Sequence, residues 1–237
     1  MADSSAMVVQ LKSRIFEAIE SSKDKGETLM HGLKSNISAI AVHPKKSVLA
    51  IAGAEGFIIL WDYIKKGDPI AFQFEQYTRD TKLMGDKKGA KDGKDLNKIF
   101  TVMEFTPDGS ELLIGQSDGE IKVVDPITAK YKKLTQPLTV SYEKKPSVKH
   151  LVVSEDGSYF ATSDSDNGVA LFKKDQVVGK DSGATTEWVF NGKIKSHEIE
   201  ITGLCFGQSL DENDQVLHRL FSIGADRKCF EYSVKDA

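Results

Sequence analysis

The side chains best suited to holding a metal ion lie in one short acidic run, SDSDNG, at residues 163–168. Asp164, Asp166 and Asn167 place several oxygen atoms close together, as a calcium loop does. Such a loop also requires glycine at its sixth position and glutamate at its twelfth. Counted from Asp164, glycine falls at the fifth position and the twelfth residue is Asp175. We therefore expect no calcium site here, and we expect no other metal or cofactor.

No group of residues has the types and spacing of a catalytic centre. The five histidines are scattered along the chain: His31, His43, His150, His197 and His218. No glycine run has the form of a phosphate-binding or dinucleotide-binding loop. The two cysteines, Cys205 and Cys229, lack the spacing of a metal site, and we expect them to be small buried hydrophobic residues on strands. The sequence thus predicts a protein that is not an enzyme.

A basic segment at residues 78–98 could contact a partner. It holds seven Lys or Arg residues against four Asp residues. Its central lysines are the candidate contacts: Lys87, Lys88, Lys91 and Lys94. The segment has no interleaved aromatic residues and its aspartates dilute the charge, so we expect no nucleic-acid binding. It reads either as a solvated hairpin loop or as a surface for acidic protein tails.

Composition excludes several other classes of function. The formal net charge of the 237 residues is -3, which gives no bias toward nucleic acid or an anionic membrane surface. No apolar run approaches the roughly 20 residues that span a bilayer. The first residues lack the basic start and apolar stretch of a secretory signal. Together with the two cysteines, this predicts a reducing, intracellular setting.

The strongest pattern in the chain is an internal repeat, and repeats of this length indicate solenoids or propellers. Four stretches align with one another: residues 37–63, 99–125, 148–174 and 201–234. Each begins with an alternating apolar run, continues through a polar turn such as Pro107–Gly109 to a second apolar run, and ends after another turn with a third. Asp-Gly turns between alternating apolar runs are a strong hairpin signal. In the fourth unit an insert at residues 210–218 lengthens the first hairpin.

Short antiparallel strands cannot bury an apolar face alone, but sheets stacked radially can. The sequence therefore predicts an all-β fold, a WD40-type β-propeller of about four blades that forms a partial ring. We expect the propeller to occupy residues 31–237 and residues 1–30 to form an N-terminal extension. The apolar spacing within Met7–Ser22 fits a helix or a strand equally well. A second polar stretch, residues 173–186, is expected to separate blades three and four.

The units resemble WD repeats. Trp61-Asp62 ends a third strand as the WD dipeptide does, and Ser196-His197 resembles the Gly-His position. The turn aspartates that resemble the family's are Asp118, Asp166 and Asp226. In that family the histidine and the turn aspartate join a hydrogen-bond network within a blade. The resemblance implies that His197 and Asp226 lie close together, linked directly or through a strand hydroxyl such as Ser222.

The fourth unit is also similar to the closing blade of a family of large ciliary WD-repeat proteins. The residues that carry this resemblance are Cys205-Phe206-Gly207, Arg219–Gly224, Asp226-Arg227 and Glu231-Tyr232. That family belongs to the calmodulin- and spoke-associated complex at the base of the third radial spoke. The resemblance implies a non-enzymatic scaffold on axonemal doublet microtubules, with spoke-base proteins, a calmodulin-containing complex and tubulin as partners. A generic WD-repeat adaptor in a soluble cytoplasmic complex is the alternative.

WD-repeat propellers usually have about seven blades. Four blades would leave an apolar face exposed at each end of an arc, and soluble proteins rarely expose large apolar patches. We therefore expect another chain, or a region missing from this one, to complete the ring.

Overall fold

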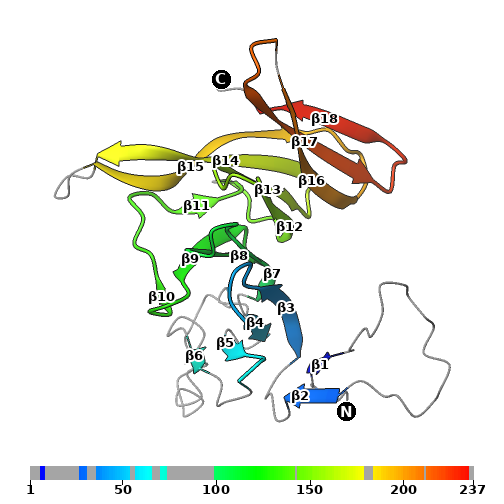
Figure 1. Cartoon of the computed structure of the whole chain (residues 1–237). Helices are drawn as coiled ribbons and strands as arrows, with labels where there is room; N and C mark the ends of the chain where they lie inside the picture. Colours follow the sequence, from blue (N-terminus) through cyan, green and yellow to red (C-terminus); the bar gives the residue numbers. More distant parts are fainter. Residues whose placement is uncertain are drawn as a thin grey trace, which may run out of the picture.

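In the computed structural model, the described part of the chain consists of strands, turns and loops (Figure 1). The structure describes residues 6–8, 27–30, 36–53, 57–65, 70–73, 99–141, 143–178, 184–210 and 212–234. None of these residues forms a helix that could span a membrane. The prediction of an all-β fold is confirmed.

Each of the four sequence repeats forms one antiparallel sheet, which we call blades 1 to 4. Blade 1 contains β3 (Ile37–Val42), β4 (Val48–Gly53), β5 (Phe57–Asp62) and β6 (Ile70–Gln73). Blade 2 contains β7 (Phe100–Phe105), β8 (Leu112–Gln116), β9 (Glu120–Asp125), β10 (Lys130–Tyr131) and β11 (Leu138–Thr139). Blade 3 contains β12 (Val148–Val153), β13 (Tyr159–Asp164), β14 (Gly168–Val178) and β15 (Ala184–Lys195). Blade 4 contains β16 (Ile201–Leu210), β17 (Val216–Gly224) and β18 (Cys229–Ser233).

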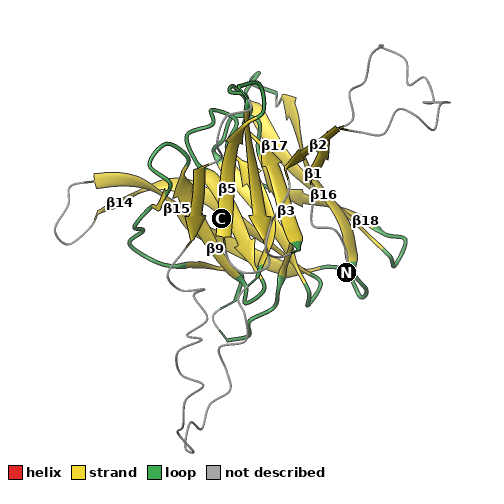
Figure 2. Ribbon diagram, turned by 90° about the horizontal axis from the view of Figure 1, so that it is seen from below, coloured by secondary structure: helices red, strands yellow, loops and turns green. Residues whose placement is uncertain are grey.

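The blades follow one another in chain order, and their first strands are neighbours. β7 lies between β3 and β12, and β12 lies between β7 and β16. Each of these strands is the first in its sheet, so the four together form the inner wall of the propeller. Figure 2 views the molecule from below, along the stack, so that sheets of different blades lie one behind another.

Apolar side chains fill the space between consecutive blades. Successive residues of a strand point to opposite faces, so the central strand of a blade serves two cores at once. In β8, for example, Ile114 packs in the core shared with blade 1, while Leu113 packs in the core shared with blade 3. A third core, which includes Ala161 and Leu220, joins blades 3 and 4. Among the described residues, consecutive blades are therefore joined by side-chain contacts rather than by backbone hydrogen bonds between sheets.

A bulge recurs at one place in each first strand, directly after its first residue. A β-bulge leaves one residue unpaired and bends the strand. In three blades that residue has a hydroxyl group, which donates to a carbonyl of the second strand. The pairs are Ser38 with Ala52, Thr101 with Gly115, and Thr202 with Ile223. The repeat seen in the sequence thus extends to this local hydrogen bond.

Two hairpins are longer than the others. The predicted lengthening in the fourth unit is present, since β16 has 10 residues and β17 has 9. The stretch 173–186, however, does not separate blades 3 and 4 as expected. Its described residues belong to β14 and β15, which form one ribbon of blade 3 that projects outward in Figure 1. Polar residues suit both faces of such a ribbon because water surrounds it, and this is why the stretch resembles a loop.

The N-terminal segment contains a short strand pair, in which β1 (Ala6–Val8) is antiparallel to β2 (Glu27–Met30). Met7 and Val8 are therefore in a strand, and the choice between helix and strand stays a prediction for the rest of Met7–Ser22, which lies outside the described residues. The basic segment 78–98, with Lys87, Lys88, Lys91 and Lys94, also lies outside them.

Candidate functional site

A chain of hydrogen bonds links four side chains within blade 4, and His197 is at its centre. His197 Nδ1 lies 2.9 Å and 3.0 Å from the two carboxylate oxygens of Asp226. On the other side of the ring, Nε2 lies 2.7 Å from Ser222 Oγ, which is 2.7 Å from the Tyr232 hydroxyl. His197 and Ser222 are each 1% exposed. The predicted contact is present, both directly and through Ser222, and Tyr232 was not foreseen.

The carboxylate of Asp226 determines the position of one proton in this network. An ionised carboxylate can only accept hydrogen bonds, so His197 Nδ1–H donates to Asp226. In the neutral ring Nε2 then accepts from Ser222, whose oxygen accepts from Tyr232. Burial opposes ionisation of Asp226, but hydrogen bonds from His197 and from the backbone N–H of Lys228 lower its pKa below the usual value. Every polar side-chain atom of these four residues thereby has a hydrogen-bond partner, as buried polar groups require.

Gly224 makes room for the histidine. A Cβ atom at this position would overlap His197 Nδ1 and crowd the Asp226 carboxylate. The strand register places Gln116 of blade 2 and Asp164 of blade 3 at the same position. Both are buried, so larger polar side chains occupy in those blades the space that the histidine fills in blade 4.

Asp164, rather than Asp166, is the buried carboxylate of blade 3. Its Oδ1 accepts from the backbone N–H of Asp166 at 2.9 Å and of Gly168 at 3.0 Å, and its Oδ2 lies 2.5 Å from Lys193 Nζ. The acidic run that resembled a calcium loop is thus held by a lysine of β15. Among the described residues, no group of acidic, histidine or cysteine side chains could hold a metal ion. Asp118, in the equivalent turn of blade 2, accepts from the backbone N–H of Glu120 at 3.3 Å.

A buried carboxylate, Glu111, joins blades 2 and 3. It lies 2.7 Å from Lys132 Nζ and 3.3 Å from Lys174 Nζ, and accepts a hydrogen bond of 2.8 Å from the Trp188 indole. Burial opposes its ionisation, but these three partners lower its pKa below the usual value. Lys174 also lies 4.8 Å from the centre of the Trp188 ring. No sequence pattern indicated this cluster, because Glu111 lies 21 residues from Lys132 and 77 residues from Trp188 along the chain.

A second junction involves His43, in the first turn of blade 1. Its Nδ1 accepts from the backbone N–H of Lys45 and Lys46, each at 3.1 Å. The ring packs on Phe105 of blade 2, and a Cβ atom on Gly109 would overlap it. Burial and the nearby charge of Lys46 lower the pKa of His43, so the ring is neutral near pH 7.

Both cysteines lie on strands but are exposed, which corrects the expectation that they are buried. The register shows why. Cys205 pairs with Phe221, and Cys229 pairs with Ile223, on the face of blade 4 opposite the core shared with blade 3. No described blade covers this face.

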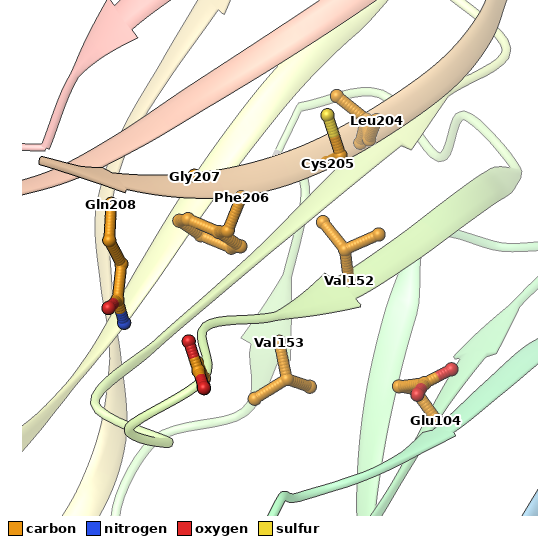
Figure 3. Close-up of a pocket in the computed structure, with 9 residues that line it drawn as sticks. Glu104, Val152, Val153, Leu204, Cys205, Phe206, Gly207 and Gln208 are labelled. Carbon is orange, nitrogen blue, oxygen red and sulfur yellow. The ribbon is translucent and has the colours of Figure 1, made fainter.

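An open groove of about 360 Å³ runs along the inner wall, across β7, β12 and β16 (Figure 3). Val152, Val153 and Phe206 line its middle, and Glu104, Glu155 and Gln208 add polar groups. Burial raises the pKa of Glu104, although its side chain is open to water on the groove side. Neither glutamate has an ion pair among the described residues.

Comparison with known proteins agrees with this geometry. Residues 26–62 match the family model described as "WD domain, G-beta repeat". These residues include Trp61-Asp62 and most of blade 1. Blade 1 therefore contains a WD repeat, and the described sheets have the arrangement of an all-β propeller. Three relatives are proteins named "Cilia- and flagella-associated protein 251". The one from Tetrahymena thermophila is 30% identical over 99% of this chain, that from Mus musculus is 28% identical over 89%, and that from Chlamydomonas reinhardtii is 21% identical over 99%.

The matched region covers 22%, 14% and 24% of those three relatives, so the chain spans less than a quarter of their length. The likeness therefore concerns this part of the ciliary WD-repeat proteins.

Trp61 of the WD dipeptide in blade 1 and Tyr232 of the hydrogen-bonded network in blade 4 occupy matching positions in their sheets. Trp61 pairs with Leu49, and Tyr232 pairs with Leu220 at the same distance from the bulge. Trp61 is buried in an apolar cluster, whereas Tyr232 uses its hydroxyl. Asp62 accepts from Ser47 Oγ at 2.8 Å and from two backbone N–H groups, so it closes the turn that follows β5.

Proposed function

We propose that this chain is a non-enzymatic scaffold that anchors protein partners at the base of a radial spoke, on the axonemal doublet microtubules of motile cilia. The observation that carries the proposal is the similarity to ciliary WD-repeat proteins over nearly the whole chain. The architecture supports it, because stacked blades joined by buried cores form a rigid body that exposes turns and hairpins for binding. Loops held by a rigid scaffold are common binding surfaces.

Localisation tests this proposal. A tagged protein should remain with axonemes after detergent extraction and should be depleted when radial-spoke bases are lost. Recovery in the detergent-soluble fraction would instead favour a generic WD-repeat adaptor in a soluble complex.

We also propose that further blades complete the ring. On blade 1, Ile40 and Val42 of β3 lie on the face away from blade 2 and are 57% and 56% exposed, whereas Leu49, Ile51, Ile59 and Trp61 on the same face are buried. On blade 4, Ile223 lies on the face away from blade 3 and is 51% exposed. Each end of the arc therefore exposes apolar side chains, and another chain or another region of the protein would cover them.

This proposal predicts that the 237 residues self-associate when purified alone, and that the completing half rescues them. Size-exclusion chromatography with light scattering measures both. A monodisperse monomer that melts cooperatively would contradict it.

A calmodulin-containing complex and tubulin are the proposed partners of this scaffold. The basic lysines Lys87, Lys88, Lys91 and Lys94 would contact the acidic tails of tubulin. Replacing all four with alanine should weaken microtubule co-sedimentation and reduce its salt dependence. The matched control removes the tails with subtilisin, which should weaken binding of the unaltered protein and leave the alanine variant unaffected.

A further inference from the structure

We propose that the groove on the inner wall binds an extended peptide segment in which a lysine or arginine lies next to apolar residues. This inference rests on the proposed scaffold role and names the chemistry of one partner.

The walls of the groove explain the apolar part of this specificity. Val152 and Phe206 belong to the partly buried side chains at the junction of blades 3 and 4, and Val153 belongs to those at the junction of blades 2 and 3. In Figure 3 they lie between Glu104 on one side and Gln208 on the other. They offer an apolar surface to aliphatic side chains and to the methylene stem of a lysine.

The charges explain the basic part. Two of the lining residues are acidic and none is basic. Glu104 is exposed to water in the groove, and neither it nor Glu155 has a cationic partner among the described residues. A lysine or arginine bound between the apolar walls would lie close to these carboxylates and be attracted to them. Both glutamates disfavour an acidic segment, so a tubulin tail does not fit this groove.

The backbone explains why we infer a peptide rather than a small amine. β16 is an edge of its sheet, with β17 as its hydrogen-bonded neighbour. An edge strand presents unpaired N–H and C=O groups that an extended segment can use. The residues from Leu204 to Gln208 line the groove along this edge. A volume of about 360 Å³ also lies in the range of sites that hold more than one side chain.

The test uses four pools of fluorescent, acetylated pentapeptides with mixed Val, Leu and Ala around a fixed central residue. The central residue is lysine, arginine, norleucine or glutamate. Fluorescence anisotropy measures binding to the protein in the assembly with which it copurifies. We expect the lysine or arginine pool to bind about fivefold more tightly than the norleucine pool, which corresponds to one exposed ion pair.

Glu104→Gln should remove most of this preference. Glu104 is exposed and glutamine has nearly the same shape, so this variant is expected to remain folded. The matched control is Glu143→Gln, the same change at an exposed residue away from the groove, which should leave binding unaltered. A melting curve of each variant checks the fold.

Equal affinity for all four pools, or a preference that survives Glu104→Gln, would overturn the inference. Its failure can be told apart from failure of the scaffold role. A protein that reaches the axoneme without preferring basic peptides would overturn the groove alone. A protein that prefers basic peptides but stays in the detergent-soluble fraction would overturn the ciliary role alone.

Discussion

Removing the hydroxyl of Ser222 tests the hydrogen-bond chain of blade 4. In Ser222→Ala, His197 Nε2 loses the partner that lies 2.7 Å away, and the Tyr232 hydroxyl loses the same one. Because His197 is only 1% exposed, water does not readily replace that partner. A buried polar atom left without a hydrogen bond costs about 1–3 kcal/mol of unfolding free energy. In a domain of this size each kcal/mol lowers Tm by about 2–4 °C.

The assay is thermal and urea unfolding followed by circular dichroism, on the protein in the assembly in which it is soluble. The control is Ser233→Ala, which makes the same change at an exposed position of β18 in the same blade. Tyr232→Phe should cost less than Ser222→Ala, because Ser222 would still hold His197. If the Ser222→Ala and Ser233→Ala variants have the same Tm, the hydrogen bonds of Ser222 do not stabilise blade 4 and our reasoning is wrong.

The hydrogen bond between His197 and Asp226 predicts that the stability of blade 4 decreases at acidic pH. The pKa of Asp226 is lowered in the folded protein, so its stabilising contribution is complete above the ordinary value of 3.8 and is lost as the pH falls through the folded value. Asp226→Asn should therefore lower Tm near neutral pH and narrow the difference between neutral and acidic conditions.

Three further substitutions test the junctions between blades. Gly109→Ala should lower Tm, because the Cβ of the new alanine would overlap His43 and the φ of 74° at this position disfavours a side chain. The control is Gly192→Ala, because nothing lies within 4 Å of a Cβ atom at that position. The pKa of His43 in the folded protein lies below 6.5, so the free energy of unfolding falls as the pH drops from 6.5 through the folded pKa. The variant His43→Asn keeps an acceptor for the turn but does not titrate, so its Tm should change less between about pH 7.5 and 5.5. Glu111→Gln should cost about 2 kcal/mol in urea unfolding, since it removes the charge that Lys132 faces, and an unchanged midpoint would contradict a role for Glu111 in joining blades 2 and 3.

The sequence by itself determined the number and order of the blades. Alternating apolar residues and Asp-Gly turns act over a few residues, so they specify hairpins without reference to the rest of the chain. The pairing of His197 with Asp226 is expected from their resemblance to WD-repeat positions rather than from the repeat itself. Alternation and turn patterns can be recognised in the sequence because they depend on interactions between residues only a few positions apart.

Tertiary structure decided which side chains meet across strands and blades. Tyr232 joins the hydrogen-bonded network because the register sets it opposite Leu220, and Asp164 is buried because Lys193 of another strand faces it. The cysteines are exposed because no described blade covers the outer face of blade 4. Glu104 and Phe206 share a groove although they are about 100 residues apart in the chain. Such contacts depend on how rigid sheets stack, and stacking is set by the sum of many apolar contacts rather than by any short motif.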